Sequence, residues 1–144
     1  MARVLLVEDE TAVLLFAEIV LEGLGHCIVS VSSQADALAL LEADDLDVLF
    51  TDIRLPESDL AGFELARQAR DRHPSLKVLY TTGQTIDDRM KALYVDGAAM
   101  LPKPYTDYAL KDALQAVLKH SVICSPSVRQ RKRSKKLATR SLPA

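Results

Sequence analysis

The sequence predicts a three-layer, doubly wound α/β domain built around a five-stranded parallel sheet. Five short apolar segments alternate with five stretches in which apolar residues recur at helical spacing. The better-defined short segments are apolar without interruption, as expected for strands that helices cover on both faces. The chain has 144 residues, of which 49% are hydrophobic, so it can form the core of one such domain.

The expected strands occupy residues 4–7, 27–31, 48–51, 78–81 and 98–101. Each is followed by a helical pattern, and the fourth pattern, which ends at Gly97, is the weakest. The apolar stripes of the five helices are Val13, Phe16, Ala17, Val20, Leu21 and Leu24; Ala37, Leu38, Leu40 and Leu41; Phe63, Leu65, Ala66 and Ala69; Ile86, Met90, Leu93 and Tyr94; and Tyr108, Leu110, Leu114, Val117 and Leu118.

Composition excludes several classes of protein. Two cysteines form neither a disulfide framework nor a zinc cluster, and Cys27, at a strand start, is expected to be buried. No apolar run approaches the roughly 18–20 residues needed to cross a bilayer. We therefore expect a soluble, cytoplasmic protein with no membrane association.

Charge divides the chain into two expected parts, a folded domain at 1–120 and a tail at 121–144. The tail carries seven basic and no acidic residues, whereas 1–120 carries 11 basic and 20 acidic residues. With little apolar periodicity, the tail is expected to be disordered. Its charge would suit nucleic acid, an acidic membrane surface or the acidic domain itself. A merely solubilising extension is at least as good an interpretation.

Chemically distinctive residues follow the expected strands. Glu8, Asp9 and Glu10 come after the first strand, and Asp52 ends the third. Thr82 follows the fourth strand, and a Pro-Lys-Pro segment centred on Lys103 follows the fifth. Ligands of open α/β sheets bind beyond the carboxyl ends of the strands, so these side chains are expected to meet in one crevice.

The crevice is predicted to bind Mg²⁺ rather than a nucleotide. The loop Glu8-Asp9-Glu10-Thr11 lacks the glycines of a phosphate-binding turn, and its charge would repel a pyrophosphate. Crowded carboxylates are tolerated when a hard divalent cation joins them. A Mg²⁺ site beside a lysine and a hydroxyl is suited to phosphoryl transfer.

This ordered set of residues resembles the receiver domain of bacterial two-component response regulators, a flavodoxin-like (βα)5 fold. The resemblance covers residues 2 to about 120 and depends on the following residues taken together: Glu8-Asp9, Asp52 with Pro56 and Gly62 downstream, Thr82, and Lys103-Pro104.

The resemblance implies that Asp52 accepts a phosphoryl group from a histidine kinase or a histidine phosphotransfer protein. Asp9 and Asp52 would bind Mg²⁺ directly, Glu8 through water, and Arg54 through its backbone carbonyl. Lys103 and Thr82 would contact the phosphoryl group. The family also implies a cis peptide bond before Pro104, and it implies a phosphoacceptor rather than an enzyme.

Three departures from the family pattern concern signal output. Met100 occupies the position of an aromatic switch residue, three residues before the lysine. Gly83 follows the threonine, where alanine is commoner, as in a Thr-Gly subgroup that lacks the aromatic switch. The Asp52-to-Gly62 segment is about two residues longer than usual.

Two further expectations concern regulation. Arg54 and Gln84 flank the crevice and are expected to tune the lifetime of the phosphoryl group. A downstream partner or a second copy of the chain is expected on the face of the fourth helix, fifth strand and fifth helix, which includes Tyr94 and Tyr108. Two alternatives stay open: an unphosphorylated interaction scaffold, and a regulator that binds nucleic acid through its tail.

Overall fold

The computed structural model describes residues 1–43 and 45–119. Five parallel strands in the order β2-β1-β3-β4-β5 form one sheet. The predicted tail and the nucleic-acid hypothesis attached to it lie outside these residues. The elements are β1 (Arg3–Val7), α1 (Thr11–Gly23), β2 (Cys27–Val31), α2 (Gln34–Ala43), β3 (Val48–Asp52), α3 (Ala61–Arg72), β4 (Lys77–Thr82), α4 (Asp88–Lys91), β5 (Ala99–Pro102) and α5 (Asp107–Lys119).

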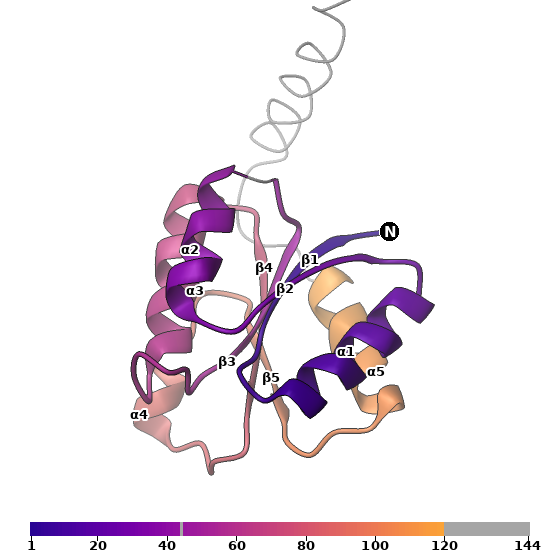
Figure 1. Ribbon diagram of the computed structural model, residues 1–144. Helices are drawn as coiled ribbons and strands as arrows, with labels where there is room; N and C mark the ends of the chain where they lie inside the picture. The colour runs from indigo at the N-terminus through magenta and orange to yellow at the C-terminus, as the bar shows by residue number, and fades with distance from the viewer. Residues whose placement is uncertain (44, 120–144) are drawn as a thin grey trace, which may run out of the picture.

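The sheet lies between two helical layers, as Figure 1 shows. Helices α1 and α5 cover one face, and α2, α3 and α4 cover the other. Strand β1 supplies both cores, because successive side chains point to opposite faces: Leu5 and Val7 pack under α2 and α3, whereas Val4 and Leu6 pack under α1 and α5. This is the predicted doubly wound, flavodoxin-like fold.

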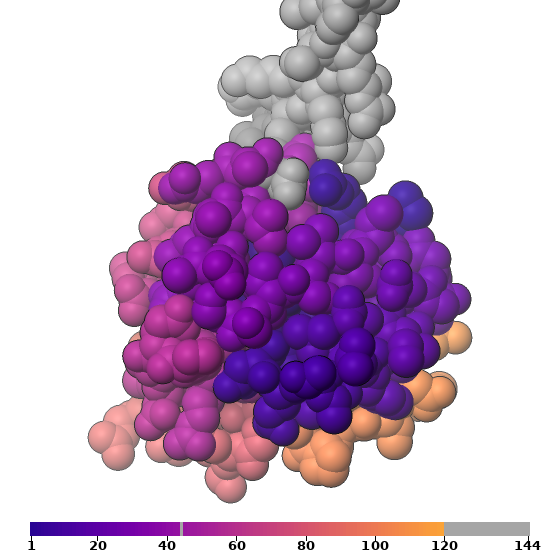
Figure 2. Space-filling view, viewed as in Figure 1, coloured from indigo at the N-terminus to yellow at the C-terminus, as the bar shows by residue number. Residues whose placement is uncertain are grey.

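In the space-filling view, α1, in indigo, lies above the orange surface of α5 (Figure 2). The two helices pack side by side over the same face of the sheet. None of the described helices is both long and apolar enough to span a bilayer.

Helix α1 differs from its predicted apolar stripe. Ala17 and Leu21 are buried as expected, but Phe16 is 40% exposed and Leu24 is also exposed. Leu14, which was not in the stripe, packs against the core. The buried line of the helix runs through residues 17 and 21, and the Phe16 ring lies 6.0 Å from the Tyr105 ring.

The fourth helix is much shorter than its pattern predicts. Helix α4 has only four residues, none of them buried. Asp87 caps it by accepting a hydrogen bond from the Met90 N–H at 2.8 Å. The chain then leaves the helix in tight turns, with bonds from Leu93 N–H to the Met90 carbonyl and from Tyr94 N–H to the Lys91 carbonyl.

The exposure of Cys27 contradicts the expected buried thiol. Strand β2 is at the edge of the sheet and pairs only with β1. All the later residues of this strand are partly exposed, whereas β3 and β4 are buried throughout. A central strand is covered on both faces and both sides, and an edge strand is not.

Candidate functional site

The carboxyl ends of four neighbouring strands place the chemically distinctive side chains at one edge of the sheet. Strand β3 ends at Asp52, β4 ends at Thr82, and β1 and β5 lead directly into Glu8 and Lys103. These strands are adjacent in the order β1-β3-β4-β5, so their ends lie next to one another. Four sequence segments that are far apart therefore build one site.

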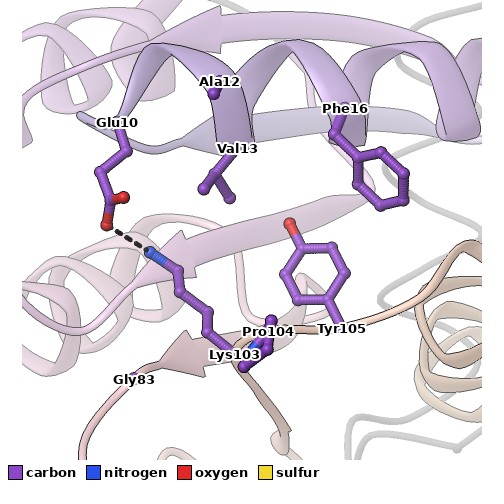
Figure 3. A pocket seen from close by; sticks show the side chains of 8 residues that line it. All are labelled: Glu10, Ala12, Val13, Phe16, Gly83, Lys103, Pro104 and Tyr105. Carbon is purple, nitrogen blue, oxygen red and sulfur yellow. Dashed lines mark ion pairs between the residues drawn. The ribbon is translucent and has the colours of Figure 1, made fainter.

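Lys103 is at the centre of the site. Its ammonium Nζ lies 2.8 Å from Asp52 Oδ2, 2.8 Å from Glu8 Oε1 and 3.5 Å from Glu10 Oε1. The Lys103 side chain is only 12% exposed, and those of Glu8 and Asp52 are almost fully buried. Figure 3 shows the lysine extended from the end of β5 toward Glu10 at the start of α1. Desolvated groups attract one another more strongly than surface ion pairs do.

The carboxylates of Glu8, Asp9 and Asp52 can converge on one metal ion. Each offers an oxygen atom, and these three atoms lie within 4.8 Å of one another. Asp9 is exposed, whereas the other two are buried, so one side of the cluster is open to solvent. A set of hard oxygen donors with an open side fits Mg²⁺, which keeps several of its waters.

Burial and charge pairing shift the pKa values of the site's ionisable groups in opposite directions. Burial raises the pKa of Glu8 to about 7, although its hydrogen bond to Lys103 acts in the other direction. Burial alone would lower the pKa of Lys103, but its hydrogen bonds to Asp52 and Glu8 outweigh that effect and raise it. Lys103 therefore stays protonated at ordinary pH beside Asp52 and Glu8.

Backbone contacts fix the side of the site formed by β4 and β5. The Lys103 N–H donates to the Thr82 carbonyl at 2.8 Å, and the Gln84 N–H donates to Thr82 Oγ1 at 3.1 Å. The Lys103–Pro104 peptide bond is cis. Met100 is partly buried and packs against the core under α3 and α4, opposite Tyr80 in the β4–β5 register.

The segment after Asp52 passes close to strand β3. The Arg54 N–H donates to Asp52 Oδ1 at 3.3 Å, and the Arg54 Nε forms an ion pair with Asp59 at 3.0 Å. Gly62, the second residue of α3, lies so close to β3 that an added Cβ would be 2.2 Å from the Asp52 carbonyl oxygen. Only glycine fits there.

The longer Asp52-to-Gly62 segment contains a small hairpin. Leu55 and Ser58 exchange two backbone hydrogen bonds of 3.1 Å, with Pro56 and Glu57 at the tip. The Glu57 carboxylate accepts one hydrogen bond from each of the first two N–H groups of α2, at 3.1 Å. These bonds lower the pKa of Glu57 against the opposing effect of desolvation. The loop is thus tied to α2, and no local pattern in the sequence indicates this contact.

A cavity of about 520 Å³ opens beside the acidic cluster. It lies between α1 and the segment that follows β5, and Figure 3 shows Val13 and Phe16 facing Tyr105 across it. The Tyr105 ring also lies 6.1 Å from Phe50. Sequence reasoning missed Tyr105, although its position two residues after Lys103 already placed it near the site.

Two kinds of comparison identify the family. The sequence pattern of the response regulator receiver domain matches residues 4–115. The chain belongs to the response regulator receiver domain family. Among solved structures, a response regulator receiver protein from Sinorhizobium medicae WSM419 superposes with a TM-score of 0.74 at 30% identity, covering 82% of this chain and 95% of that one.

Curated relatives agree with the receiver assignment. The sensor kinase CckA of Brucella abortus is 32% identical over 120 residues, which are 81% of this chain and 12% of that kinase. The response regulator receiver protein CpdR of the same organism is 37% identical over 83 residues, covering 58% of this chain and 68% of CpdR. The chain spans between 12% and 52% of the length of the first three curated relatives that it matches. The receiver is thus often one part of a longer protein.

Proposed function

We propose that this receiver is a Mg²⁺-dependent phosphoacceptor switch in two-component signalling, and that Asp52 accepts the phosphoryl group. The observation that carries the proposal is the position of the Asp52 carboxylate. It is buried at the end of β3, 2.8 Å from Lys103 Nζ and within the cluster of three carboxylates. The phosphodonor is a phosphohistidine of a sensor kinase or of a histidine phosphotransfer protein.

In the proposed reaction, an Asp52 carboxylate oxygen attacks the phosphorus atom of the donor. A new P–O bond forms to Asp52, and the bond from phosphorus to the leaving nitrogen breaks, with its electron pair departing on the imidazole. Lys103 is placed to pair with the added phosphoryl oxygens, because its ammonium already contacts Asp52. The product is an aspartyl phosphate.

The Mg²⁺ ligands are proposed to be Asp9 and Asp52 directly, Glu8 through water, and the backbone carbonyl of Arg54. When bound, the ion would neutralise charge on the phosphoryl oxygens. The arrangement of Glu8, Asp9 and Asp52 supports this assignment, because their oxygens can approach one ion. Arg54 and Gln84, which contact Asp52 and Thr82 through their backbone N–H groups, are proposed to tune the phosphoryl lifetime.

Incubation with Mg²⁺ and a small acyl phosphate should add one phosphoryl group to the intact chain, as measured by mass spectrometry. Asp52→Asn should abolish the addition. Asp112→Asn, which removes an exposed aspartate of α5, should leave it intact. A chelator should suppress it. Undiminished phosphorylation of the Asp52→Asn protein would exclude Asp52 as the acceptor, and no phosphorylation of the unsubstituted chain would favour an interaction scaffold.

The downstream partner, or a second copy of the chain, is proposed to bind the face formed by α4, β5 and α5. Tyr108 on α5 is 75% exposed. An exposed aromatic ring of this kind can supply apolar contact area to a docked partner. This face also follows directly from Thr82, whose hydroxyl would sense the phosphoryl group.

A further inference from the structure

The turn that joins α4 to β5, which we call the 94–96 turn (Tyr94, Val95 and Asp96), is attached to the inside of the molecule. The Val95 N–H donates a hydrogen bond of 3.2 Å to the hydroxyl oxygen of Tyr80 on β4. The Asp96 carbonyl accepts one of 2.9 Å from Arg70 Nη1 on α3. The turn is therefore connected both to the strand that ends at the site and to the neighbouring helix.

Aromatic contacts add to this attachment. The Tyr94 ring stacks on Phe63 of α3, with centroids 5.8 Å apart, and lies 5.1 Å from the Tyr80 ring. Phe63 and Tyr80 meet edge to face at 5.1 Å. These geometries are favourable for aromatic pairs. The three rings form one cluster beneath the short helix α4.

Tyr80 is well placed to connect the site with the 94–96 turn. It is fully buried, and burial raises its pKa to about 12, so its hydroxyl stays neutral at ordinary pH. It precedes Thr82 by two residues on the same strand, and residues two apart project to the same face. It also pairs with Met100 across the β4–β5 register. A movement of the β4 end is therefore transmitted directly to this ring.

We propose that the hydrogen bond between the Tyr80 hydroxyl and the Val95 N–H, here called the Tyr80 latch, couples Thr82 to the 94–96 turn. The inference rests on the proposed function, since the latch responds to a phosphoryl group on Asp52. Met100 has no ring that could alternate between buried and exposed positions. Tyr80 supplies instead a fixed buried ring whose hydroxyl holds or releases the 94–96 turn.

The expected response is release. Attraction between the Thr82 hydroxyl and a phosphoryl oxygen would draw the end of β4 toward the site and shift Tyr80 relative to the turn. At 3.2 Å the latch is already at the long end of the range for N–H···O bonds, whereas the Arg70–Asp96 bond at 2.9 Å is not. Opening of the latch would free the Val95 amide and the adjoining face.

Amide hydrogen exchange of Val95, followed by NMR on the full chain, tests the latch. Without phosphorylation, Tyr80→Phe should raise the Val95 exchange rate about tenfold, because the variant removes only the acceptor oxygen. Ser32→Ala removes an exposed hydroxyl that lies outside the site and the proposed docking face, and it should leave Val95 unchanged. An unchanged rate in Tyr80→Phe would contradict the latch without any bearing on phosphorylation.

The second arm compares each protein before and after treatment with Mg²⁺ and a small acyl phosphate, with the added phosphoryl group counted by mass. Phosphorylation should speed Val95 exchange about tenfold in the unsubstituted chain and in Ser32→Ala, and should add little in Tyr80→Phe. A phosphorylated chain with undiminished Val95 protection would overturn the coupling. Absence of the phosphoryl group itself would overturn the proposed function, and mass alone would reveal it. The comparison in the unsubstituted chain holds even if Tyr80→Phe folds poorly.

Discussion

Helices α3 and α4 follow the two strands that bear Asp52 and Thr82, and they are held to the molecule very differently. Helix α3 has 12 residues, six of them buried, and its first turn touches the backbone of β3 through Gly62. Helix α4 has four residues, and none of them is buried. Both belong to the same helical layer in Figure 1.

The difference shows which side of the site can move. Displacing α3 would expose a large apolar area and is therefore costly. Helix α4 buries none of its own residues, and the region is held by the Asp87 cap, the Tyr80 latch and the ring contacts of Tyr94, so it can rearrange for a smaller fraction of the global stability than α3 can. The side of the site that carries Asp52 is tightly packed, and the α4 region beside Thr82 is less so.

The largest expected effect on stability comes from a substitution that disturbs the contact between α3 and β3. In Gly62→Ala the new Cβ would lie 2.2 Å from the Asp52 carbonyl oxygen and 2.7 Å from Ile53 Cα, both of which are backbone atoms. We expect a loss of at least about 3 kcal/mol in the free energy of unfolding, measured with urea. Gly23→Ala is the matched control: its Cβ meets nothing within 4 Å, and it should be neutral or slightly stabilising. Equal stability of the two variants would show that α3 can shift freely.

Truncation of one leucine on α3 and of one after α4 compares how tightly the two regions are packed. Leu65 on α3 is fully buried, so Leu65→Ala should cost about 2–5 kcal/mol of unfolding free energy. Leu93, after α4, is 46% exposed, and Leu93→Ala should cost less than about 1 kcal/mol. Urea titration of both variants checks this prediction. Similar losses would mean that the α4 region is as tightly packed as α3.

Alkaline pH tests the burial of Tyr80, which lies between the two regions. Burial raises its pKa to about 12, whereas a tyrosine in the unfolded chain ionises near 10. Between these values the folded chain holds the proton that the unfolded chain has lost, so stability falls as pH rises through this window. The contribution is about 1 kcal/mol near pH 11.

The same loss should be smaller in Tyr80→Phe. Tyr105 has a pKa raised in the same direction and remains in the variant, so only the difference between the two proteins reports on Tyr80. The measurement is the unfolding free energy at neutral and alkaline pH. Parallel pH profiles would show that Tyr80 is accessible to solvent.

The smallest expected effect concerns the start of α4. Asp87→Ala removes the oxygen that accepts from the Met90 N–H and should destabilise this helix locally by about 1 kcal/mol. Faster amide exchange at Met90, with no change in the urea midpoint, would confirm local loosening. Asp88→Ala leaves the cap in place and is the control. A lowered global midpoint for Asp87→Ala would indicate that α4 unfolds together with the core.

Much of the architecture could be predicted because the strands have a strong and simple pattern. Continuous apolar runs located all five strands to within about one residue, and parallel pairing then required their carboxyl ends to meet. The proximity of four residues could be predicted without any knowledge of side-chain contacts: Glu8, Asp52, Thr82 and Lys103. Their position follows from strand ends, which the sequence marks by an abrupt change from apolar to polar residues.

Features that depend on neighbours could not be predicted in this way. The exposure of Phe16 depends on how α1 rotates against the sheet and α5, and that of Cys27 depends on β2 being an edge strand. The weak pattern before Gly97 is compatible with a full helix, but the chain forms only four helical residues there. The Tyr80–Val95 contact joins residues 15 apart, and neither has a local signature.

The hairpin at Pro56 and Glu57 makes the loop after Asp52 part of the structure of α2. Two of the first N–H groups of α2 bond to the Glu57 carboxylate, and the Asp36 N–H bonds to Ser33 Oγ. Shortening this loop to the usual receiver length would therefore uncap a distant helix. In a chimaera or a redesigned receiver, the loop and the first turn of α2 must be exchanged together as a unit.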